Sequence, residues 1–112
     1  MSRPSINARV SDDVLSPGEM VRDELKARGW TQGDLAAVMG RPPRLISELV
    51  NLKRRVTAQT AHELGAAFGT SPDLWMKIEA AWQLARVKID DKTIRERARM
   101  LEQQKGPTHA PR

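Results

Sequence analysis

Residues 32–51 contain two short apolar segments separated by a turn that begins at Gly40, and this spacing constrains the fold more than any other feature. Two helices joined by a tight turn cross steeply, so the residues at their crossing have to be small. Ala36 meets that requirement in the first segment, and Gly40 allows a positive φ in the turn at little cost. Ile46 and Leu49, three residues apart, place apolar side chains on one face of the second segment. The pattern predicts a helix-turn-helix.

Helix signals also dominate the rest of the chain, whereas strand signals are nearly absent. Ser16-Pro17-Gly18-Glu19 combines an N-cap serine, a proline at the first helical position and a glutamate three residues after the cap. We therefore expect an all-α protein. The predicted helices are about 17–28 before Gly29, a second from Thr31 to Gly40, a third from about Pro43 to Asn51, a fourth from Thr57 to Gly69, and a long fifth opening at Ser71-Pro72-Asp73.

The chain divides into three predicted parts: a flexible N-terminal arm over 1–13, a helix-turn-helix domain over 14–88, and a basic, partly helical tail over 89–112. Its length corresponds to one ordinary domain. A sixth helix is predicted in the tail over about 91–104. Its apolar face is thin, so we expect it to need a docking partner.

Positive charge is concentrated in two segments. Residues 41–55 carry five Lys and Arg against one Glu, and residues 86–112 carry eight against four acidic residues, whereas residues 12–40 are acidic overall. A localised basic patch is typical of nucleic-acid binding. Charge alone fits a solvated basic surface equally well.

The outward face of the predicted third helix carries side chains that suit base edges in a major groove. Arginine pairs with guanine, glutamate accepts from the cytosine amine, and asparagine suits adenine. Against this stands the plainer interpretation, a helical hairpin with a polar outer face, which the spacing and the basic flank disfavour. The predicted base contacts are Pro43, Arg44, Ser47, Glu48 and Asn51.

A second set of residues is predicted to contact the sugar-phosphate backbone. Helix N-termini offer free N–H groups to phosphates, and the basic run that follows the third helix adds charge. The predicted phosphate contacts are Thr31, Gln32, Lys53, Arg54, Arg55 and Thr57.

An apolar stripe on the predicted fifth helix continues beyond what a five-helix core covers. Trp75 and Trp82 lie seven residues apart, hence on one face; both could be core, an interpretation that suits Trp75 better. We expect the later part of the stripe to form a two-fold dimer interface. The predicted interface residues are Ile78, Ala81, Trp82 and Ala85.

Enzyme, metal and membrane functions find little support. Cysteine is absent and the two histidines lack metal-ligand spacing, so we expect no metal, no cofactor and no catalysis. No apolar run reaches the ~18 residues of a membrane span, and the N-terminus lacks the apolar core of a signal peptide. We expect a cytoplasmic protein.

The order of these motifs resembles the HigA-type antitoxins of bacterial toxin–antitoxin pairs, within the phage-repressor-like helix-turn-helix class. The resemblance covers about residues 16–86, and Arg41, Pro42 and Leu52 depart from it. The matching landmarks are Pro17-Gly18-Glu19, Thr31-Gln32-Gly33-Asp34-Leu35-Ala36, Ile46-Ser47-Glu48-Leu49 with Asn51, Lys53-Arg54-Arg55-Val56-Thr57, Thr60-Ala61, Leu64, Gly69-Thr70-Ser71-Pro72-Asp73-Leu74-Trp75 and Ala80-Ala81-Trp82-Gln83-Leu84.

The resemblance implies a five-helix phage-repressor-like domain with an additional C-terminal helix. It also implies a homodimeric repressor that binds a palindromic DNA operator, lies on the nucleoid when bound, autoregulates its operon and neutralises a small HigB-like mRNA-cutting toxin. Two alternatives stay open: a stand-alone regulator without a toxin, and a protein-interaction module that has lost DNA binding. The three departures, Arg41, Pro42 and Leu52, favour the second alternative.

Overall fold

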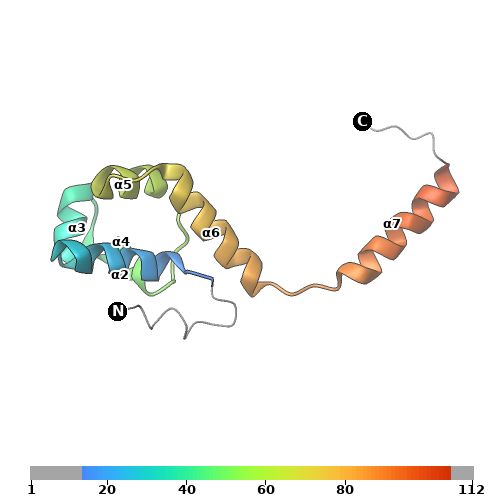
Figure 1. The fold of residues 1–112 in the computed structure, drawn as a ribbon, viewed down its shortest axis with the longest axis horizontal. Coiled ribbons are helices and arrows are strands. Elements are labelled where there is room, and N and C mark those ends of the chain that lie inside the picture. Colours follow the sequence, from blue (N-terminus) through green and yellow to red (C-terminus); the bar gives the residue numbers. More distant parts are fainter. Residues whose placement is uncertain (1–13, 107–112) are drawn as a thin grey trace.

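The structure is a computed structural model that describes residues 14–106, and within that range it contains helices and no strands (Figure 1). The all-helical expectation is confirmed, and each predicted helix is present at the expected place. The predicted arm, 1–13, lies outside the described residues. The helices are α2 (Pro17–Arg28), α3 (Gln32–Met39), α4 (Pro43–Val50), α5 (Ala58–Phe68), α6 (Pro72–Arg86) and α7 (Asp91–Lys105).

Side-chain caps set most of the helix starts. The Ser16 hydroxyl accepts a hydrogen bond from the backbone N–H of Glu19, whose carboxylate contacts the backbone of Ser16 in return. Thr31 and Asp34 form the same reciprocal capping box at the start of α3. Such caps satisfy N–H groups that lack partners within the helix. These local signals explain why the sequence locates the helices well.

Helices α2 to α6 pack around one apolar core (Figure 1). Trp75 of α6 is completely buried, and its indole N–H donates to the Thr70 hydroxyl at 2.8 Å. The expectation that Trp75 belongs to the core is confirmed. The other large, fully buried side chains are Val21, Leu35, Ile46, Leu49 and Leu64.

The N-terminus of α2 lies directly against the C-terminus of α4. A Cβ atom added to Gly18 would lie 2.4 Å from the Val50 carbonyl oxygen, so only glycine allows this approach. The contact fixes α4 at its C-terminal end, whereas its N-terminal end follows the turn from α3.

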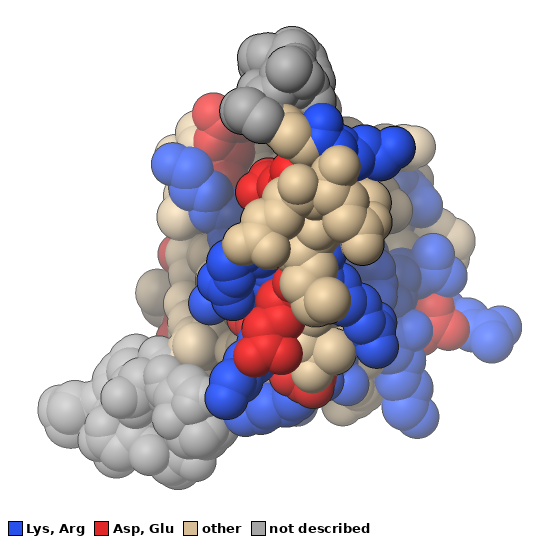
Figure 2. Space-filling model, turned by 90° about the vertical axis from the view of Figure 1, so that its right-hand side faces the viewer, with Lys and Arg blue, Asp and Glu red and all other residues tan. Residues whose placement is uncertain are grey.

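Helix α7 extends away from the other five helices (Figure 1), and none of its residues is buried. Ile94 and Leu101 remain 54% and 52% exposed. Figure 2, which views the molecule from this end, shows a band of uncharged residues with Lys and Arg on both sides of it and Asp and Glu side chains along it. The helix is therefore amphipathic and open to solvent, and its need for a docking partner stays a prediction.

None of the described helices is long and apolar enough to cross a membrane.

Candidate nucleic-acid interface

The turn between α3 and α4 depends on Gly40, which has φ of 69° and ψ of 33°. Its N–H donates to the carbonyls of Ala36 and Ala37, and the Arg41 N–H donates to Ala36 at 2.9 Å. These bonds satisfy the last carbonyls of α3. Gly40 therefore forms the turn as the sequence predicts, and the small Ala36 before it is buried.

Helix α4 begins at Pro43 although its N-cap residue, Pro42, makes no side-chain hydrogen bond. Pro42 has φ of −64° and ψ of 143°, the extended backbone of an ordinary N-cap. Pro43 occupies the first turn, where a missing N–H costs nothing. The departure at Pro42 thus leaves the helix start unchanged.

The apolar and polar residues of α4 separate onto two faces. Leu45, Ile46, Leu49 and Val50 are buried, as the spacing predicts. The opposite face is open to solvent, which leaves it free for a partner. It carries the five predicted base-contact residues, of which Pro43, Arg44 and Asn51 are exposed and Ser47 and Glu48 are half-buried.

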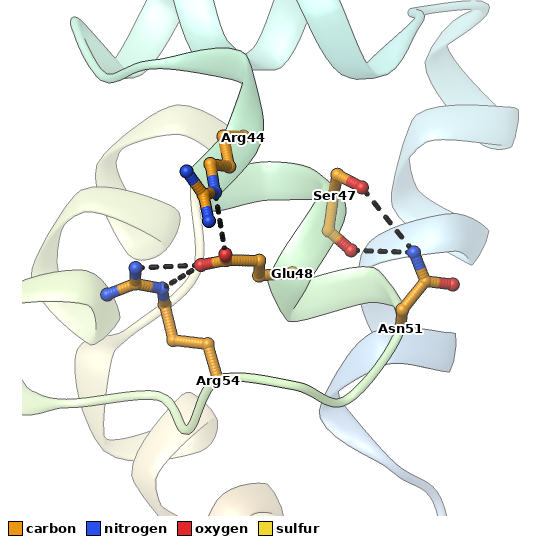
Figure 3. Close-up of polar contacts among 5 residues, drawn as sticks. All are labelled: Arg44, Ser47, Glu48, Asn51 and Arg54. Carbon is orange, nitrogen blue, oxygen red and sulfur yellow. Dashed lines mark hydrogen bonds and ion pairs between the residues drawn. The ribbon is translucent and has the colours of Figure 1, made fainter.

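Glu48 connects two arginines on this face (Figure 3). Its Oε2 lies 3.0 Å from Arg44 Nε, and its Oε1 lies 2.9 Å from Arg54 Nε and 2.7 Å from Arg54 Nη2. The hydrogen bond from Arg54, and then that from Arg44, hold the pKa of Glu48 below its ordinary value. Glu48 is therefore ionised at neutral pH, and its carboxylate is paired with both arginines. Sequence reasoning placed it on this face but missed the bridge.

Asn51 turns back onto α4 (Figure 3). Its amide nitrogen donates to the Ser47 carbonyl at 2.9 Å and lies 3.5 Å from the Ser47 hydroxyl. This side chain is a second donor to a carbonyl that already accepts the Asn51 backbone N–H at 3.0 Å. Two of the predicted base-contact residues thus also stabilise the helix that presents them.

The predicted phosphate contacts occupy two helix starts and one loop. Gln32 is exposed in the first turn of α3, while the Thr31 and Thr57 hydroxyls accept from Asp34 and Thr60 N–H groups as N-caps. Lys53, Arg54 and Arg55 are all exposed in the loop after α4.

Leu52 opens this loop with φ of 60°, the only positive φ of a non-glycine residue among those the structure describes. It stands where the resemblance places a glycine, and its backbone adopts the left-handed conformation that glycine favours. Leu52 therefore adopts this backbone at a steric cost that a glycine would not carry.

Two carboxylates that sequence reasoning missed anchor the site. Arg41 Nη1 lies 2.7 Å from Glu63 Oε1 on α5, which gives the unusual arginine in the turn a partner. Glu79 of α6 is buried, accepts the Val56 N–H at 2.9 Å, and accepts from Gln83 Nε2 at 2.7 Å. Glu79 thereby ties the loop after α4 to α6. The sequence offered one indication that Glu79 is buried, namely its position within the apolar stripe of α6.

The predicted dimer residues all lie on α6. Ala81 is exposed, and Ile78, Trp82 and Ala85 are half-buried, so the stripe is only partly covered within one chain. Its role as an interface stays a prediction.

Within residues 14–106, no three His, Cys, Asp or Glu side chains gather closely enough to hold a metal ion.

Comparisons with known proteins agree with this geometry. The helix-turn-helix family model HTH_3 matches residues 21–75. Virulence-associated protein I of Dichelobacter nodosus is 33% identical over 82 residues, which span 72% of this chain and 76% of that protein. Antitoxin HigA-1 of Vibrio cholerae is 38% identical over 71 residues, 62% of this chain and 67% of that protein. PA4674 of Pseudomonas aeruginosa, solved in complex with its operator DNA, superposes with a TM-score of 0.65 at 27% identity, covering 73% of this chain and 91% of that one.

Proposed function

Because this chain belongs to the helix-turn-helix family HTH_3, together with the HigA-type antitoxins, we propose that it is a sequence-specific DNA-binding repressor. The observation that carries the proposal is the solvent-facing side of α4, where Arg44, Ser47, Glu48 and Asn51 gather beside the basic loop 53–55. Arginine, glutamate and asparagine on one exposed helix suit direct contact with base edges. The adjoining cations suit phosphates.

In this proposal α2 to α6 form a phage-repressor-like domain over residues 14–88, and α7 belongs to a separate basic tail. We place the protein in the cytoplasm, on the nucleoid when DNA is bound. Ser47 contacts the amide of Asn51 rather than a histidine or lysine, so we assign it no catalytic role.

The direct test is binding to a duplex from the chain's own upstream region, measured by fluorescence anisotropy over a range of salt concentrations. Each phosphate neutralised by a cation steepens the logarithmic salt dependence by about 0.9. We expect specific binding that weakens steeply with salt, because Arg44 and the cations of loop 53–55 displace several counterions. A salt-insensitive or undetectable affinity would overturn the proposal.

The alternative of an interaction module without DNA binding depends on Arg41, Pro42 and Leu52 distorting the motif. Arg41 is paired with Glu63, α4 starts at Pro43, and Leu52 keeps a left-handed turn. These features support an intact helix-turn-helix and disfavour the alternative.

We further propose that the protein neutralises a small toxin, since a relative of this chain is named as an antitoxin. The test is co-expression with the product of the adjacent open reading frame. Growth arrest by that product alone, relieved by this chain, supports an antitoxin. A harmless neighbour that does not bind the chain favours a stand-alone regulator.

A further inference from the structure

We propose that the cavity between the loop after α4 and the C-terminal half of α6 binds a phosphate group. The cavity has a volume of about 340 Å³ and is lined by residues 52–55 of the loop and by Glu79, Trp82, Gln83, Arg86 and Val87. It joins residues that the sequence assigned separately to DNA and to dimer contacts. If the phosphate belongs to DNA, the inference rests on the proposed function.

Trp82 supplies the first argument. Its indole nitrogen is buried and has no hydrogen-bond partner within residues 14–106. The indole of Trp75 shows the ordinary arrangement, because its N–H donates to Thr70. A buried donor without an acceptor costs free energy, and such groups are rare in folded proteins. Trp82 therefore calls for an acceptor that residues 14–106 do not supply.

The charge of the cavity wall supplies the second argument. Lys53, Arg55 and Arg86 line it, and none of the three forms an ion pair within the described part of the chain. The Arg86 guanidinium lies 5.7 Å from the centroid of the Trp82 ring, so cation and indole share one wall. The wall also contains Arg54, which is paired with Glu48. An anionic acceptor suits this surrounding better than a neutral one.

Glu79 is the single carboxylate of the wall, and both of its oxygens are already engaged, one by the Val56 N–H and the other by Gln83. The four cations outnumber it, so the wall keeps a positive charge. Phosphate presents several oxygens to donors arriving from different directions, as the loop and α6 require. A carboxylate presents only two oxygens, so we commit to phosphate.

The test uses ¹⁵N-labelled full-length chain and follows the three indole N–H resonances by NMR, with Trp82→Phe identifying the Trp82 signal. Inorganic phosphate is titrated at constant ionic strength against chloride, and the upstream duplex is titrated separately. We expect a saturable downfield shift of the Trp82 signal and an unmoved Trp75 signal. Arg86→Gln should weaken the phosphate response at least about tenfold, whereas Lys77→Gln, on the same helix but outside the cavity, should leave it unchanged.

The two titrations distinguish a phosphate of the DNA backbone from a free phosphate group. A shift with the duplex points to a backbone phosphate, and a shift with inorganic phosphate alone points to a free phosphate ester. A shift with phosphate from a chain that does not bind the duplex would sink the proposed function and leave the cavity inference standing. A Trp82 signal that neither phosphate source moves, or that chloride moves equally, would overturn the inference.

Discussion

Glu48 determines how the exposed face of α4 presents its charges. Its carboxylate holds Arg44 and Arg54 together, so both arginines are partly neutralised before any DNA arrives (Figure 3). A phosphate or a base edge has to compete with this carboxylate for each guanidinium. Glu48 therefore works against indiscriminate binding, because random DNA offers the arginines phosphates but no matched base edge.

Glu48→Gln should free both arginines and tighten binding to random duplexes more than binding to the operator. The salt dependence for random DNA should steepen by about 0.9 for each phosphate gained. Anisotropy titrations with both duplexes measure the ratio. The matched control is Glu24→Gln, which removes a comparable carboxylate paired with Arg28 on α2. If Glu48→Gln instead lost operator binding alone, the proposed contact of Glu48 with a base, and not its hold on the two arginines, would determine specificity.

Arg44 and Arg54 should differ in what they contribute. The Arg44 side chain is 84% exposed on α4, whereas Arg54 comes from the loop beside the helix. Arg44→Ala should cost about 1–3 kcal/mol and relax the preference at one operator position. Arg54→Ala should weaken all duplexes alike. Binding to a panel of single-position operator variants distinguishes the two, and an equal loss on every duplex for Arg44→Ala would contradict this orientation of α4.

At the scale of elements, the turns that bound α4 carry opposite conformational costs. Leu52 holds a left-handed backbone with a side chain that penalises it, while Gly40 holds a similar backbone without penalty. The left-handed conformation costs a non-glycine residue roughly 1–2 kcal/mol, and glycine loses about 0.5–1 kcal/mol in extra chain entropy.

Leu52→Gly should therefore raise the free energy of unfolding by up to about 1.5 kcal/mol, the largest difference between these two effects. Gly40→Ala should lower it by about 1 kcal/mol through strain alone, because an added Cβ there meets no atom within 4 Å. Urea denaturation measures both. A destabilised Leu52→Gly chain would show that the side chain of Leu52, 39% exposed, contributes more by packing than its backbone costs.

At the scale of the whole molecule, α6 leaves an incompletely covered stripe that we propose as the dimer interface. Ala81→Glu should give a monomer, because a carboxylate in a closed apolar contact is costly. Ala81 is exposed, so its own subunit should stay folded. Ala80→Glu provides the control, since this exposed alanine is on the same helix but points away from the stripe.

Sedimentation velocity and operator binding report the two consequences. The Ala81→Glu monomer should retain weak half-site binding, because α4 is untouched. A two-fold dimer sets its recognition helices about 34 Å apart, so loss of the dimer should abolish the preference for an inverted repeat. A protein that remained dimeric with Ala81→Glu would move the interface to another surface of the chain.

The sequence alone determined where the helices lie, where they turn and which face of α4 is buried. Ser16, Thr31 and Gly40 act within a few residues of themselves, because caps and left-handed turns are local, and that is why the helix boundaries and the turn agree with expectation. The apolar periodicity of α4 likewise decided which of its faces is buried. The pair Arg44–Glu48, four residues apart on one helix, was also within reach of the sequence.

Only the tertiary structure decided what the charged residues do. Arg54 reaches Glu48 because the chain reverses at Leu52, Glu63 meets Arg41 across 22 residues, and Glu79 accepts the Val56 N–H across 23. The unpartnered indole of Trp82 and the cavity beside it depend on the same meeting of loop and helix. Such contacts join side chains whose separation depends on the packing of three helices. The sequence positions of long polar side chains follow no periodicity from which their partners could be predicted.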